Sequence, residues 1–190
     1  MQNNVSLRLA KRIWEVVEKE EESGELFEKV SPITKELLRF WFCEPFVSQR
    51  QFNFHKGQKQ SILNIIYLHE VLKINNVLEI YEQVAPDLLL ESDLFGTKET
   101  RNSLKESRYD LPKYLVKMAT GTGKTWVMHA LLIWQILNAK NEEEKSGRFT
   151  KNFLIVAPGL IVYDRLLDAY KGRLSENGDG RYFSTNVFVS

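Results

Sequence analysis

The sequence is poor in cysteine: Cys43 is the only one among 190 residues. A single cysteine excludes an internal disulfide and argues against a cysteine-based metal site, which suits a reducing cytosol. No apolar run approaches the ~18 residues that a membrane-spanning helix needs. The opening stretch MQNNVSLRLAKR also lacks the apolar core of a secretory signal. We therefore expect a cytoplasmic protein with no membrane partner.

Neither sign of charge is in excess. The 26 basic and 25 acidic residues leave a formal net charge of +1. This balance argues neither for nor against a nucleic-acid partner, because backbone amides and a few local cations are enough to grip phosphates. The hydrophobic content of 43% and the charged content of 27% are ordinary for a globular chain long enough to form a real core.

The two halves of the chain differ in pattern. Residues 1–92 have helical periodicity almost throughout, and residues 93–112 form a polar loop or insertion. From residue 113 onward, apolar strands alternate with helices, which predicts an α/β fold with parallel strands and right-handed crossovers. The predicted helices are 5–21, one beginning at Ser31-Pro32, 58–72, 76–84, 124–138 and 161–170, and the predicted strands are 114–118, 153–158 and 186–190.

The stretch KMATGTGKTW at 117–126 lies between a predicted strand and a predicted helix. It fits the phosphate-loop formula, glycine, four residues, Gly-Lys-Ser/Thr, except that Met118 replaces the first glycine. Glycines let the backbone curl so that successive N–H groups face one anion, and the following helix adds its positive end. A lysine there reaches the β and γ phosphates, and the adjacent hydroxyl ligates magnesium.

These residues predict a site for ATP and Mg²⁺, with Thr125 as the residue that ligates the metal. The alternative is a glycine turn that is followed by Lys-Thr by chance. The predicted cofactor-binding residues of the loop are Thr120, Gly121, Thr122, Gly123, Lys124 and Thr125.

The wording MATGTGKT resembles motif I of the superfamily 2 helicases and translocases of the DEAD/DEAH type. In particular it is similar to the motor (Res) subunits of type I and type III restriction enzymes, in which a methionine at this position is familiar. The resemblance implies that residues 113–190 are the first part of a RecA-like P-loop domain, preceded by a mainly helical region.

A second stretch, FNFHKGQKQSI, is similar to the glutamine motif of the same superfamily. The resemblance implies that Gln58 pairs with the adenine edge, and an amide offers the matching donor and acceptor. The alternative is an ordinary polar residue at a helix start. Gln58 precedes Gly121 by 63 positions, so the chain must return to the pocket after a long interval. His55, His69 and His129 lack metal-ligand spacing and are assigned no role.

A third stretch, VAPGLIVYDRL, resembles motif Ia. The resemblance implies that Pro158, Gly159 and Leu160 open a helix whose free N–H groups contact a nucleic-acid phosphate, with Arg165 assisting. The alternative is a plain strand-to-helix turn, with Arg165 a solvated helix residue.

Hydrolysis of ATP also needs a Walker B acid and a residue that orients the attacking water. The family supplies these in a D-E-x-H sequence, which is absent from the 190 residues, and its arginine fingers come from a second motor domain. We therefore expect the N-terminal part of a longer motor, truncated before Walker B, with no catalytic residue of its own and little ATPase activity alone.

The resemblance implies that the parent is an ATP-dependent helicase or translocase of a restriction-modification system. It would act on duplex DNA, with a methylase or specificity subunit as partner and room for an endonuclease domain downstream. Three alternatives stay open: a non-motor nucleotide-binding module, a subunit-docking module formed by residues 1–92, and an RNA helicase of the same superfamily.

Overall fold

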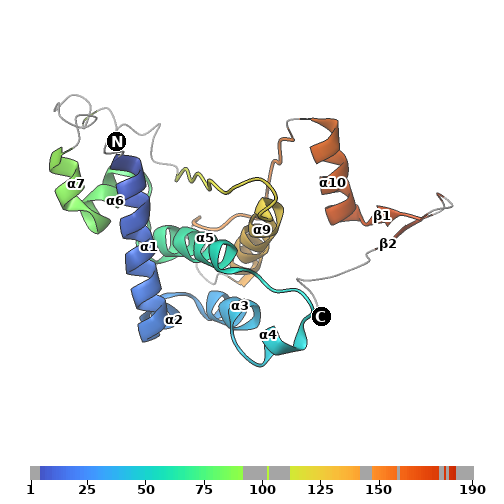
Figure 1. Cartoon of the computed structure of the whole chain (residues 1–190), viewed down its shortest axis with the longest axis horizontal. Coiled ribbons are helices and arrows are strands. Elements are labelled where there is room, and N and C mark those ends of the chain that lie inside the picture. The colour runs from blue at the N-terminus through green and yellow to red at the C-terminus, as the bar shows by residue number, and fades with distance from the viewer. Residues whose placement is uncertain are drawn as a thin grey trace.

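A computed structural model describes residues 5–91, 102, 112–141, 147–157, 159–175, 178 and 180–182. Most of these residues are helical (Figure 1). The first part of the chain forms α1 (Val5–Ser23), α2 (Glu25–Lys29), α3 (Pro32–Phe42), α4 (Phe46–Gln49), α5 (Lys56–Ile66), the π-helix η1 (Tyr67–Val71), α6 (Val77–Val84) and α7 (Pro86–Glu91). The later part forms α9 (Lys124–Asn141), α10 (Leu160–Lys171), β1 (Arg173–Leu174) and β2 (Arg181–Tyr182). Within these ranges, no helix combines the length and hydropathy needed to cross a bilayer.

The helix starts follow from capping side chains. Ser31 accepts a hydrogen bond from the backbone N–H of Thr34 at 3.1 Å, and Pro32 occupies the first position of α3, as the sequence predicted. Asn76 caps α6 by accepting from the backbone N–H groups of Leu78 and Glu79. Each cap satisfies N–H groups that would otherwise lack a partner in the first helical turn.

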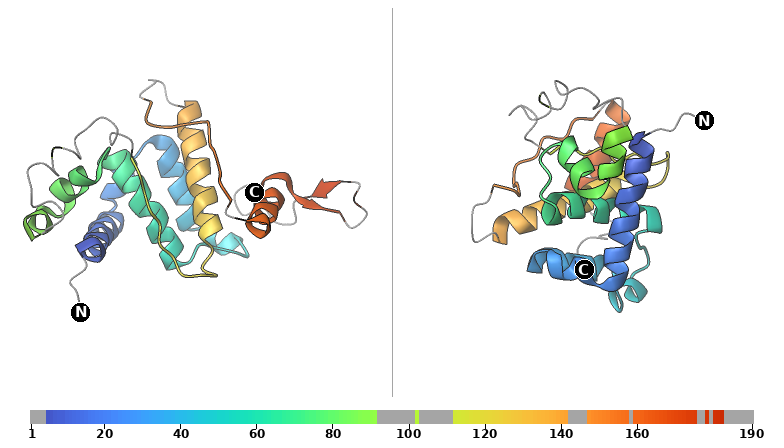
Figure 2. Two further views of the ribbon diagram at one scale, coloured as in Figure 1. Left: turned by 90° about the horizontal axis from the view of Figure 1, so that it is seen from above. Right: turned by 90° about the vertical axis from the view of Figure 1, so that its left-hand side faces the viewer.

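The core lies where α5 packs against α1 and α9, and α9 also packs against α3. Figure 2 shows these helices gathered in one body, with α10 and the short β1–β2 hairpin standing to one side. The largest fully buried side chains include Trp41, Trp134, Leu26, Leu38, Ile62, Leu63 and Ile66. One core therefore includes residues from both sides of the predicted loop at 93–112. The division into regions 1–92, 93–112 and 113–190 stays a prediction, and most of the middle region lies outside the described residues.

The α/β prediction is wrong for the part of the chain that the structure describes. Its one sheet is the antiparallel β1–β2 pair, in which Arg173 lies opposite Tyr182 and Leu174 opposite Arg181. The described residues contain no parallel strands, so the expected partial RecA-like domain is not formed there.

The predicted strand at 114–118 is extended but has no strand partner among the described residues. Tyr114, Val116 and Met118 pack against the helical core, whereas Leu115 is 90% exposed. One face of this apolar segment therefore packs on helices, and no other described segment pairs with its edges as a strand. A run of apolar residues indicates which side chains are buried, but not which backbone will pair with it.

The predicted strand at 153–158 is extended over its described residues and largely exposed. Leu154 is 90% exposed and Val156 81%. A strand of a parallel sheet is buried on both faces and bonded on both edges, and neither condition holds for residues 153–157 within the described part of the chain. Pro158 and the third predicted strand, 186–190, lie outside the described residues.

A buried polar network joins α3, η1 and α9. The hydroxyl of Thr34, which is fully buried, donates to Glu70 Oε2 at 2.8 Å. The Thr34 hydroxyl oxygen also accepts from Trp134 Nε1 at 2.9 Å and from Asn138 Nδ2 at 3.0 Å. The Thr34 hydroxyl of α3 is thus hydrogen-bonded to residues of both η1 and α9, and Glu70 is its partner in η1. Buried polar groups of this kind are stabilising only while all of them are paired.

Arg148 attaches the segment after α9 to the same π-helix. Its guanidinium donates to the carbonyl oxygens of His69 at 2.6 Å and Ile74 at 3.0 Å, and to Asn75 Oδ1 at 3.1 Å. The His69 ring contacts the Arg148 carbonyl oxygen and the Tyr114 hydroxyl. Burial lowers the pKa of His69, so the neutral form of the ring is favoured.

Thr34→Val is expected to lower the free energy of unfolding by about 1–3 kcal/mol, because it leaves Glu70, Trp134 and Asn138 each without one partner. Urea unfolding followed by near-ultraviolet circular dichroism measures the change. Thr34→Ser keeps the hydroxyl and loses one methyl group, so it should cost only about 1 kcal/mol. If Thr34→Ser lowers the free energy of unfolding by more than this expected amount, the packing of the methyl group, and not the hydrogen-bond network, is what matters at this position.

Candidate functional site

A glycine loop, residues 119–123, connects the extended segment 112–118 to the start of α9. Gly121 and Gly123 have φ angles of 81° and 72°, in the left-handed region that favours glycine. The Thr122 N–H and hydroxyl both donate to the Ala119 carbonyl oxygen, at 3.4 and 2.7 Å, and close the turn. The sequence therefore forms the tight curl that its glycines predicted.

The ammonium group of Lys124 folds back over this turn. Its Nζ donates to the Ala119 carbonyl oxygen at 2.7 Å, while the residue itself is exposed at the first position of α9. A cation that is held beside a helix N-terminus and yet exposed can exchange a neutral carbonyl for an anionic oxygen. Thr120, within the loop, and Thr125, in the first turn of α9, are also exposed.

Gln58, in the first turn of α5, lies directly behind the loop. Its side-chain Nε2 donates to the carbonyl oxygens of Thr122 and Gly123, each at 3.3 Å, and its Oε1 accepts from the backbone N–H of His55 at 3.0 Å. The residue is 6% exposed. The chain thus returns to the loop, and residues 64 positions apart meet.

Both polar atoms of the Gln58 amide, Oε1 and Nε2, are hydrogen-bonded to protein groups. The adenine-pairing role that the resemblance implies therefore stays a prediction. The structure adds a contact that the sequence did not predict, between this amide and the loop backbone. Glycine at position 123 suits this contact, because a Cβ there would lie 2.3 Å from Gln58 Nε2 and the amide would have to move.

His55 is a site residue that sequence reasoning missed. It caps α5, with its Nδ1 accepting from the backbone N–H groups of Gly57 and Gln58, and its Nε2 lies 3.1 Å from the Thr122 carbonyl oxygen. Histidine is not among the favoured capping residues, so composition gave no signal. The available signal was spacing: His55 and Gln58 stand at the first and last positions of a capping box.

An aromatic cluster around Phe54 packs against the first turn of α9, next to the loop. Phe54 contacts Trp41, Phe42 and Trp126 with ring centroids 5.6–6.1 Å apart. Trp126 belongs to the first turn of α9, so the cluster holds that turn against the segment that carries Gln58. Phe52, in contrast, is half exposed. Phe54 is therefore committed to the core, whereas Phe52 is accessible to a ligand.

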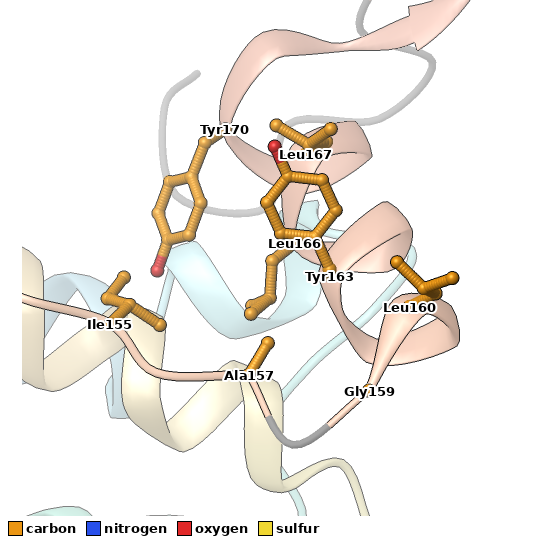
Figure 3. Close-up of a pocket in the computed structure, with 8 residues that line it drawn as sticks. All are labelled: Ile155, Ala157, Gly159, Leu160, Tyr163, Leu166, Leu167 and Tyr170. Carbon is orange, nitrogen blue, oxygen red and sulfur yellow. The ribbon is translucent and has the colours of Figure 1, made fainter.

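The predicted nucleic-acid residues lie around the start of α10. Gly159 precedes the helix, Leu160 is 80% exposed, and Arg165 is exposed as well. Their contact with nucleic acid stays a prediction. Figure 3 shows α10 facing Ile155 and Ala157 across an apolar cavity of about 480 Å³. Tyr163, Leu166 and Tyr170 of the helix line it.

One ring contact joins α10 to α9. The rings of His129 and Tyr170 lie 4.9 Å apart between centroids. Burial lowers the pKa of His129 and raises the pKa of Tyr170, so both rings are held in their neutral forms. This contact links the predicted nucleic-acid segment to the helix that begins at Lys124.

The candidate site thus combines a curled glycine backbone, a lysine at a helix start, and a glutamine from a distant helix behind it. The ResIII family, described as "type III restriction enzyme, res subunit", matches residues 51–187. The matched range includes His55, Gln58 and the glycine loop. The chain belongs to this family, which carries an ATP-dependent, helicase-like domain of the restriction-enzyme type. No curated protein and no solved structure matches the chain.

Gly123→Ala and Gly121→Ala are a matched pair that tests the packing behind the loop. Both replacements strain a left-handed residue by roughly 1–2 kcal/mol, but only the Cβ at 123 would collide with Gln58. A Cβ at 121 meets nothing within 4 Å. We expect the Gly123→Ala protein to have the lower free energy of unfolding, as measured by urea titration. Equal losses would show that Gln58 does not pack on the loop in solution.

Proposed function

We propose that this chain grips Mg-ATP in the loop 119–125 and is the nucleotide-binding part of an ATP-dependent DNA helicase or translocase of a restriction system. The observation that carries the proposal is the meeting of Gln58 with Thr122 and Gly123, inside the range that the ResIII family matches. A glycine turn formed by chance would need no buried glutamine from another helix behind it.

Each residue of the loop has a role in the proposal. The backbone N–H groups of Gly123 and Lys124 face the phosphates, and the start of α9 adds its positive end. Lys124 leaves the Ala119 carbonyl and neutralises the β and γ phosphates. Mg²⁺ arrives with the nucleotide, and the Thr125 hydroxyl supplies one ligand. Residues 119–125 fit this task, because Lys124 and Thr125 are exposed side by side at the helix start.

In this proposal, the parent protein carries out ATP hydrolysis and movement along DNA. The 190 residues contain no D-E-x-H sequence, so the chain alone binds ATP with little turnover. Duplex DNA is the proposed track of the motor, contacted through Gly159, Leu160 and Arg165. Support for these contacts comes from the exposure of Gly159 and Leu160 at the start of α10 and of Arg165 further along the same helix, and from the restriction-type family. A methylase or specificity subunit is the proposed protein partner.

Mg-ATP is expected to raise the melting temperature of the wild-type chain and not that of Lys124→Ala. If the dissociation constant were about 1 mM, nucleotide at about 10 mM would add roughly 1.4 kcal/mol. For a chain of this size that corresponds to about 3–6 °C. Thermal unfolding followed by circular dichroism, with and without Mg-ATP, measures the shift.

Lys140→Ala is the matched control, since it removes the same charge from the exposed last turn of the same helix. It should keep the full shift. Equal shifts in the wild type and Lys124→Ala would remove Lys124 from the site. Absence of a shift in all three proteins would contradict the proposed function.

A further inference from the structure

The imidazole ring of His55 bonds in two directions. On one side, Nδ1 lies 3.1 Å from the N–H of Gly57 and 3.4 Å from that of Gln58. On the other side, Nε2 lies 3.1 Å from the carbonyl oxygen of Thr122 in the glycine loop. The same side chain therefore caps α5 and contacts the loop.

These contacts fix the protonation state of the ring. Backbone N–H groups can only donate, so Nδ1 must be the unprotonated acceptor. A carbonyl oxygen can only accept, so Nε2 must carry the hydrogen. The pattern is satisfied by the neutral Nε2–H tautomer and by no other form of the ring.

Gly57 provides the space that the ring occupies. A Cβ at position 57 would lie 3.2 Å from His55 Cε1 and 3.4 Å from Nδ1, which is tighter than ordinary contact. Glycine inside a helix costs roughly 1 kcal/mol relative to alanine. Glycine thus occupies the position in the first turn of α5 where any other side chain would contact the His55 ring too closely.

The contact controls the direction of the loop amides. A trans peptide is planar and carries its C=O and N–H on opposite sides. The Thr122 carbonyl is held towards α5 by His55 and Gln58, and the Gly123 carbonyl is held by Gln58. The N–H groups of Gly123 and Lys124 belong to these same two peptide planes, so both point away from α5. Two adjacent N–H groups on one side form a concavity for an anion.

We propose that His55, as the neutral Nε2–H tautomer, is a positioning residue that sets the orientation of the anion-binding amides of Gly123 and Lys124. It acts through the Thr122 carbonyl and not by touching the nucleotide. The tautomer and the orientation of the amides stand on the geometry alone. The consequence for nucleotide affinity rests on the proposed function.

The first experiment reads the tautomer directly. Long-range ¹H–¹⁵N correlation spectra of the ¹⁵N-labelled chain near neutral pH, without nucleotide, distinguish the three forms of the ring, and the His55→Asn spectrum assigns the signals. A pyridine-type Nδ1 and a pyrrole-type Nε2 are expected. A protonated ring, an Nδ1–H tautomer or an averaged mixture would overturn the proposal.

The second experiment separates capping from positioning. Asparagine is a good helix cap but is too short to reach Thr122 as well, so His55→Asn should keep most of the stability and lose the loop contact. His55→Ala should lose both. In amide spectra, His55→Asn is expected to shift the Gly123 and Lys124 signals. Unchanged loop amides in His55→Asn would reduce His55 to a helix cap and overturn the proposal.

The third measurement is the affinity for Mg-ATP of the wild type and of His55→Asn, by isothermal titration calorimetry. Removing one hydrogen bond that orders the site should weaken binding about three- to tenfold. Equal affinities would overturn the proposal. Lack of binding by the wild type would contradict the proposed function, and the tautomer and the loop amides would then still decide whether His55 positions the loop.

Discussion

The amide group of Gln58 lies against the backbone of the glycine loop, and the rest of the site depends on this contact. It holds the carbonyl oxygens of Thr122 and Gly123, and it is itself oriented by the backbone of His55. A buried amide that binds only protein groups is stable when each group has a partner. A helix from another part of the chain thus holds two carbonyl oxygens of the loop and leaves the opposite side of the loop to face outward.

The helical core carries this contact. The Thr34 network joins α3, η1 and α9, and the Phe54 cluster holds the first turn of α9 close to the segment before α5. Because α9 begins at Lys124, any displacement of that helix also moves the lysine relative to Gln58. Packing energy far from the loop therefore decides how well its amides and its cation are placed.

Local features of this protein follow from local sequence. The Ser31-Pro32 helix start, the Asn76 cap and the glycine turn at 121–123 each depend on residues within one turn of the chain. The strands could not be predicted in the same way. The apolar runs at 114–118 and 153–158 showed which side chains tend to be buried, but a strand also needs a partner backbone. In the described structure, helices cover one face of the first run, and the second run is largely exposed.

The sequence by itself determined the composition of the site: two glycines, a lysine and a threonine at a helix start, and a glutamine upstream. Only the tertiary structure decided that Gln58 faces the loop carbonyls and that His55 belongs to the site. The reason is physical. Backbone curvature and helix starts are set by neighbours along the chain, whereas a contact across 64 positions is set by the packing of α5 against α9.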